Sequence, residues 1–204
     1  MEYYLQGFIL GLAYVAPIGM QNLYVINTSL STGLKQSLLL AWIVVFFDIT
    51  LAAGCFFGIG YLLEQFLWLQ MLLLAAGGIA VIKIGYELLI SSPAADNSRI
   101  ASSWLNAVKS ACIVTWFNPQ AILDGTLLLG GMKAALPAAA GEYFIAGVCS
   151  ASCLWFTGLA VLVSLVKASF NEKVLFYINR ICGIVIMFYG GKLLYHLLDI
   201  ICQG

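Results

Sequence analysis

The chain has 204 residues, of which 63% are hydrophobic and only 9% are charged. Soluble domains carry about 25% Asp, Glu, Lys and Arg, so this composition excludes an ordinary water-soluble protein and indicates one that lies in a membrane. The mean hydropathy of +1.01 agrees with this interpretation. Nine basic and nine acidic residues cancel to a net charge of zero, and without a basic stripe no nucleic-acid partner is expected.

Six apolar stretches are each long enough to cross a bilayer, which takes about 20 mostly apolar residues in a helix. In chain order they cover about residues 4–26, 36–61, 67–90, 107–130, 143–166 and 174–200. Lipid cannot satisfy open backbone polar groups, so helices are the architecture that fits these lengths. The expected fold class is therefore all-α, a polytopic membrane protein with six transmembrane helices and lipid around them.

An internal repeat links the two halves of the chain, which the polar segment 91–106 separates. Residues 17–22 align with residues 119–124, and Asp48 aligns with Ser152. Each half holds three spans, an odd number, so the halves enter the membrane from opposite sides. This is the inverted-topology repeat of many secondary transporters. The sequence thus predicts a single transmembrane transporter domain over 1–204, with repeats over about 1–90 and 107–204 joined by the loop 91–106.

Glycines of the third and sixth spans repeat in the same way. Gly78 and Gly85 align with Gly183 and Gly190. Small residues let membrane helices approach closely. Such an approach at Gly54, Gly58 and Gly60, or at Gly77 and Gly78, is compatible with contacts inside one chain or between two copies, so a homodimer is left open.

Basic residues predict the orientation, because Lys and Arg accumulate in short cytoplasmic loops. The connections after spans one, three and five contain Lys35, Arg99, Lys109, Lys167 and Lys173. The opposite side has Lys133 in its loops. Lys192 lies close to the end of the last span, where a lysine is expected to anchor the helix at the membrane surface rather than to bind a ligand. We therefore expect both termini outside the cytoplasm.

Two prolines lie near the middle of spans one and four, where proline breaks or kinks a helix. Pro17 and Pro119 occupy equivalent repeat positions, and each is followed five residues later by a polar side chain, Asn22 or Asp124. Discontinuous helices of this kind form substrate sites in transporters, although a simple packing kink is the alternative. The expected substrate-binding residues are Pro17, Gln21, Asn22, Asn118, Pro119 and Asp124.

Two carboxylates lie well inside the predicted spans. Ionised groups within a bilayer are costly and usually mark ion, proton or substrate pathways. Asp124 is the candidate for binding cargo, and Asp48 is the candidate for carrying a coupling proton. Lys83 of span three is an available ion-pair partner for either carboxylate, but it can equally extend to the membrane surface.

No motif of a known enzyme class occurs in the sequence, so no catalytic residue is expected. Cys149 and Cys153 are four residues apart and share a helix face, a spacing that permits a soft metal ion. Small packing residues in a tight helix contact are the preferred interpretation. We therefore expect neither a bound metal nor a cofactor.

The motifs around the two prolines resemble the LysE family of amino-acid exporters. Residues 17–22 and 114–124 carry the resemblance, together with Asp48 and residues 150–156. The branch most similar to this chain is that of the lysine and arginine exporters. Met20 departs from the family pattern, which usually has a second proline there, so the first break should be less sharp.

The resemblance implies a secondary transporter that exports an amino acid across the bacterial inner membrane, driven by protons or by the membrane potential. Its cargo would be L-arginine or L-lysine, because a carboxylate at Asp124 suits a guanidinium or ammonium group. Asn22 and the N–H groups after both prolines would hold the α-carboxylate. Export of small neutral amino acids or of a divalent cation such as cadmium is the alternative within transport. A membrane scaffold or subunit that transports nothing is the alternative from another class.

Overall fold

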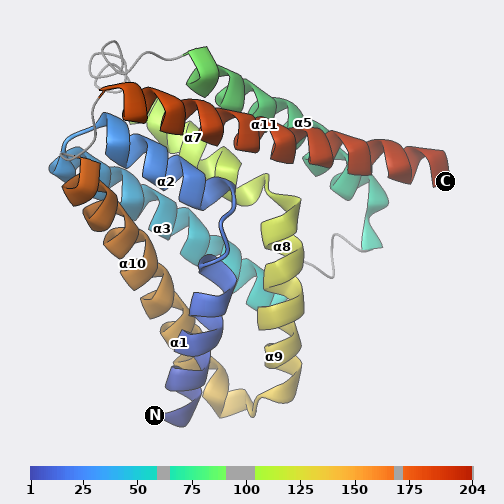
Figure 1. Cartoon of the computed structure of the whole chain (residues 1–204). Coiled ribbons are helices and arrows are strands. Elements are labelled where there is room, and N and C mark those ends of the chain that lie inside the picture. The colour runs from blue at the N-terminus through green and yellow to red at the C-terminus, as the bar shows by residue number, and fades with distance from the viewer. Residues whose placement is uncertain (59–64, 91–103, 168–171, 204) are drawn as a thin grey trace.

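The computed structural model describes residues 1–58, 65–90, 104–167 and 172–203 (Figure 1). Within these ranges every element is a helix and no strand occurs, which confirms the all-α class. The longer helices are α1 (Glu2–Val15), α2 (Met20–Ser31), α3 (Leu34–Phe57), α5 (Leu67–Ile90), α7 (Trp104–Trp116), α10 (Gly141–Val166) and α11 (Glu172–Gln203).

Three helices of the described part are long and apolar enough to cross a membrane: α3, α10 and the Arg180–Cys202 portion of α11. The bent pair α1 and α2 is a fourth candidate span. The structure thus agrees with a multi-pass membrane protein. The prediction of six spans in two inverted halves is finer than this finding and stays a prediction.

The first break separates α1 from α2. Four residues, 16–19, lie between the two helices, and the helix axes differ by 75°. Proline has no N–H to donate and clashes with the preceding turn, so α1 ends just before Pro17. Met20 is the first residue of α2 and is fully buried. The methionine at this position is therefore compatible with a sharp bend.

The second break separates α7 from α8 (Pro119–Gly125). Only two residues lie between these helices, and Pro119 is the first residue of α8, a position where its missing N–H costs nothing. The chain continues through a π-helical turn (Thr126–Gly130) into α9 (Gly131–Ala135). A 3₁₀ turn (Ala138–Ala140) then precedes α10.

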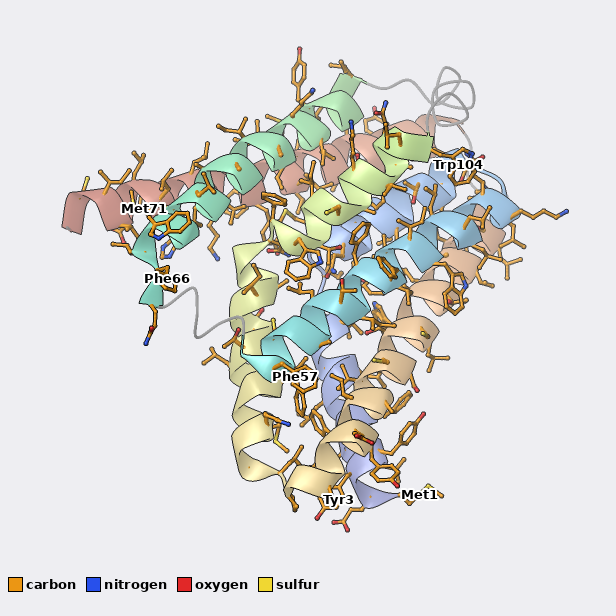
Figure 2. The ribbon with its side chains drawn as sticks, turned by 180° about the vertical axis from the view of Figure 1, so that it is seen from behind. Met1, Tyr3, Phe57, Phe66, Met71 and Trp104 are labelled. Carbon is orange, nitrogen blue, oxygen red and sulfur yellow. The ribbon has the colours of Figure 1, made fainter. Side chains whose placement is uncertain are left out.

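Close helix contacts depend on glycine. The helices α5 and α11 lie side by side in both views (Figures 1 and 2) and pack against each other. A Cβ atom on Gly85 would lie 2.8 Å from the carbonyl oxygen of Gly183, and one on Gly78 would lie 3.2 Å from that of Gly190. Numbers rise along α5 as they fall along α11, so the two helices run antiparallel. Gly77 meets Phe117, the residue that follows α7, so the glycine contacts at Gly77 and Gly78 lie within one chain.

The outer surface is apolar, as a lipid environment requires. Phe57, Phe66 and Trp104 are among the large side chains on it (Figure 2), with 70%, 46% and 48% of their surface exposed. Inside, the largest buried side chains include Phe56 and Phe144, whose rings stack with centroids 5.6 Å apart. The protein is therefore packed around α3 and α10 and exposes hydrophobic side chains outward.

The basic residues that predict orientation gather at one end of the molecule. The end of α2 and the start of α3 lie there with the end of α10 and the starts of α7 and α11, far from the N-terminus (Figure 1). Lys167 at the end of α10 donates to the carbonyl oxygen of Ser29 (3.0 Å) and to that of Thr32. A cation there complements the negative end of α2. Arg99 lies outside the described residues.

Candidate functional site

A cavity of about 330 Å³ lies where the two breaks meet α11. This volume is at the lower end of the roughly 300–1,000 Å³ range of small-molecule sites. Its walls come from the end of α1, the first break, the start of α2, the short helix α8 with the residue before it, and the middle of α11. The lining residues are Tyr14, Val15, Pro17, Ile18, Gly19, Gln21, Asn22, Asn118, Ala121, Asp124, Tyr189 and Lys192.

The first break gives the cavity an uncapped helix N-terminus. Gly19 is the residue before α2, and it has no side chain that could bond the first N–H groups of that helix. The first hydrogen bond back to the break is made only by Leu23, whose N–H donates to the carbonyl of Gly19 at 3.0 Å. The preceding amides of α2 point toward the break, and a helix N-terminus attracts negative charge.

Asn22 supports the end of α1. Its Nδ2 atom donates to the carbonyl oxygens of Val15 (3.0 Å) and Pro17 (2.7 Å), and its Oδ1 atom accepts from the indole of Trp155 (2.8 Å). These bonds satisfy carbonyls that the break removes from helical bonding. The Asn22 side chain therefore stabilises the backbone of the first break. Its expected contact with the α-carboxylate of a cargo stays a prediction.

The second break is capped by its own side chain. The Oδ1 atom of Asn118 accepts from the N–H of Ala121 (3.4 Å), and its carbonyl accepts from Ile122 (3.1 Å). This is the usual role of Asn as an N-cap. Asp124 lies further along the same helix, half-buried, and lines the cavity. The second break thus contributes a carboxylate to the cavity.

Asp48 lies outside the cavity in a buried polar network. It is fully buried on α3 and accepts hydrogen bonds from Gln21 Nε2 (3.0 Å) and Ser152 Oγ (2.6 Å). The same Gln21 amide also lies 3.2 Å from the hydroxyl of Thr115. Gln21 lines the cavity as well, so one side chain connects the cavity with this carboxylate. Both hydrogen-bond partners of Asp48 are neutral.

The structure brings most of the predicted site residues together. Five of them line one cavity: Pro17, Gln21, Asn22, Asn118 and Asp124. The sixth, Pro119, is the first residue of α8, the helix that carries Asp124. Their role in binding stays a prediction.

Lys83 is exposed on α5, and within the described part of the chain it forms no ion pair. The hydrogen bonds of Asp48 go to neutral groups instead. Cys149 and Cys153 are partly buried on α10. Among the described residues no three His, Cys, Asp or Glu side chains gather in a way that could hold a metal ion.

Two residues of α11 were missed by sequence reasoning. Tyr189 lines the cavity and donates from its hydroxyl to the carbonyl oxygen of Ile18 (3.2 Å). Lys192 lines it too, although its position near the end of the last span had suggested a surface anchor. The repeat gave no signal for either residue, because they reach the cavity through tertiary packing of α11 against the first break.

Comparisons with known proteins agree with this architecture. A family model described as LysE type translocator matches residues 12–197. The arginine exporter protein ArgO of Salmonella paratyphi A (strain ATCC 9150 / SARB42) is 32% identical over 193 residues, covering 91% of this chain and 90% of the relative. That of Enterobacter sp. (strain 638) is 31% identical over 201 residues, covering 95% and 93%.

No solved structure matches the chain. The family match extends over both breaks, the buried carboxylate of α3 and the part of α11 that reaches the cavity. It indicates a multi-pass membrane transporter rather than an enzyme. The chain belongs to the LysE family of translocators.

Proposed function

We propose that the protein exports basic amino acids, with L-arginine or L-lysine as cargo, from the bacterial cytoplasm. The observation that carries this proposal is that one cavity contains both the Asp124 carboxylate and the uncapped N-terminus of α2. A basic amino acid has an anionic group and a cationic side chain, and these two features of the cavity complement them. The arginine exporters among the relatives support the same cargo.

Export of small neutral amino acids is the second candidate. The α-ammonium group that every amino acid carries could also bind Asp124. The two candidates differ in what Asp124 contacts, the cationic side chain or the α-ammonium group. A basic cargo is preferred because a guanidinium fits a carboxylate in two parallel hydrogen bonds.

The inverted repeat has support in the packing of α5 against α11. In the repeat alignment Gly78 is equivalent to Gly183, and Gly85 is equivalent to Gly190. The contact between Gly78 and Gly190 is therefore equivalent to the contact between Gly183 and Gly85, and both contacts occur. A pseudo-two-fold axis between these helices, lying in the membrane plane, would generate such a pattern. Six spans in two inverted halves of one domain are part of this proposal.

Cytoplasmic placement of the basic end is also part of the proposal, and cysteine labelling tests it. Gly33 and Ala139 are exposed at opposite ends of the molecule. In a background without the native cysteines, Gly33→Cys should react only from the cytoplasm and Ala139→Cys only from outside. Labelling of Gly33→Cys from outside intact cells would reverse the orientation.

Asp48 is proposed to carry the proton that drives export. Its burial among neutral partners supports this role, because a carboxylate without a cation beside it gains by taking up a proton. Protonation of Asp48 would alter its hydrogen bond with Gln21, and because Gln21 also lines the cavity, the cavity would change with it. Asp48→Asn should then bind arginine nearly as well as the wild type but lose efflux driven by a pH gradient in liposomes. Undiminished gradient-driven efflux would remove Asp48 from this role.

Ligand-dependent stability of the purified protein tests the cargo. A ligand that binds the folded state raises its stability by RT ln(1 + [L]/Kd). Arginine and lysine should raise the melting temperature in detergent, while threonine and leucine should not. A response to the neutral amino acids alone would favour the second candidate, and protection of cells against cadmium alone would favour a metal exporter.

A further inference from the structure

Lys192 is a cation at the cavity that has no partner among the residues the structure describes. It projects from α11, one turn after Tyr189, whose hydroxyl contacts the first break at Ile18. Among the described residues, Lys192 makes no hydrogen bond or ion pair, neither with Asp124 nor with a backbone carbonyl. An ammonium group placed at a cavity in this way is available to an anionic group of a ligand.

Tyr14 offers an independent sign that a polar ligand belongs in this cavity. Its side chain is only 8% exposed and lines the cavity, and its hydroxyl has no hydrogen-bond partner within the described residues. A buried polar group without a partner costs about 1–3 kcal/mol. The ring of Tyr14 lies against Gly125 of α8, where a Cβ atom would be 3.3 Å from its Cε2 atom. Its hydroxyl is thus confined close to the helix that carries Asp124.

The uncapped start of α2 complements these side chains. The helix has 12 residues, and its N-cap residue Gly19 makes no side-chain bond to its first N–H groups. The Gly19 backbone is extended, and a Cβ atom there would meet only the carbonyl oxygen of Pro17, at 3.9 Å. The first turn of α2 borders the cavity through Gly19, Gln21 and Asn22.

We propose that Lys192 and the first amides of α2 bind the α-carboxylate of the cargo, with the Tyr14 hydroxyl as a further hydrogen-bond partner, while Asp124 binds the cationic side chain. This assignment rests on the proposed function and gives the cargo one orientation in the cavity. It makes Lys192 a substrate-binding residue rather than a surface anchor.

Arginine and agmatine test the assignment, because agmatine keeps the guanidinium but lacks the α-carboxylate. Binding of both to detergent-purified protein is compared in the wild type, Lys192→Met and Lys192→Arg. Lys192→Met should weaken arginine binding by about ten- to a hundredfold, the range of a charged hydrogen bond, and leave agmatine binding unchanged. Lys192→Arg keeps the positive charge and should retain most of the preference for arginine.

Two further variants complete the experiment. Lys35→Met removes an exposed lysine at the start of α3, which does not line the cavity, and should change neither affinity. Tyr14→Phe should weaken arginine binding by about two- to tenfold through loss of one hydroxyl. An unchanged melting temperature without ligand shows that each variant is folded. Equal losses for arginine and agmatine in Lys192→Met, or no loss for either, would overturn the assignment.

Failure of the proposed function has a different signature, because the wild type would then not bind arginine or lysine. If it binds leucine instead, leucine and its decarboxylated amine replace the first pair of ligands. Selective loss of leucine binding in Lys192→Met would still support a carboxylate site at Lys192. A wild type that binds no amino acid would overturn both proposals.

Discussion

The two helix breaks follow the same sequence pattern but satisfy their helix ends in opposite ways. At the first break, Asn22 bonds backward to carbonyls of α1 and leaves the start of α2 uncapped. At the second, Asn118 bonds forward and caps α8. The first break therefore presents N–H groups to the cavity, and the second presents the carboxylate of Asp124. The two halves of a repeat can therefore break their helices at equivalent positions and still present opposite charges to the cavity.

This difference suits a cargo that carries both signs of charge. Two identical breaks would offer two anion sites or two cation sites. The observed pair offers one of each in a single cavity, with Lys192 from α11 adding positive charge. Substitutions that make the two breaks more alike in charge should weaken arginine binding. Substitutions that remove only the hydrogen bonds at a helix end should lower the free energy of unfolding.

The largest effect is expected where the second break loses its charge. Asp124→Asn should weaken arginine binding by about 2–5 kcal/mol, because a guanidinium taken out of water loses its ionised partner. Isothermal titration in detergent measures the change. Asp199→Asn, which alters an exposed carboxylate of α11 outside the cavity, is the matched control. Unchanged arginine affinity in Asp124→Asn would end the charge-pair interpretation.

The first break should be more sensitive to loss of its asparagine than the second. Asn22→Ala removes bonds to two carbonyls and leaves the Trp155 indole without its acceptor. Partly buried groups left unsatisfied cost about 1–3 kcal/mol each, so we expect a loss of about 3 kcal/mol in the free energy of unfolding. Denaturant titration of the detergent-solubilised protein checks this value. A loss below that of Asn118→Ala would reverse the assigned roles.

A smaller loss is expected at the second break. Asn118→Ala removes one N-cap bond to Ala121, and such substitutions cost about 1 kcal/mol. Asn118→Asp keeps an acceptor at the cap and serves as the control, with stability near that of the wild type. Equal losses in both variants would show that the cap does not stabilise α8.

The smallest effect on stability is expected from giving the first break a cap. Gly19→Ser adds a hydroxyl where a Cβ atom has room, and a serine cap is better than glycine by only a few tenths of a kcal/mol. Arginine binding should nevertheless weaken, because the hydroxyl takes an N–H that the cargo would use. Gly19→Ala, which adds the Cβ atom without an acceptor, separates the two effects. Tighter arginine binding in Gly19→Ser would contradict a carboxylate site at this helix start.

The sequence alone predicted the helical class, both breaks and five of the residues that line the cavity. Proline acts on the local backbone, so Pro17 and Pro119 marked the breaks without any knowledge of tertiary structure. The roles of Asn22 and Lys192 were not predictable in this way. An amide can bond to any nearby donor or acceptor, and its choice of the α1 carbonyls depends on the 75° bend. Lys192 reaches the cavity only because α11 packs across the first break.

A structure with L-arginine bound tests the central claim most directly. The account predicts that the α-carboxylate lies within hydrogen-bonding distance of the first amides of α2 and of Lys192, and that the guanidinium lies against Asp124. Arginine bound in the reverse orientation, or outside the cavity between the two breaks, would contradict it.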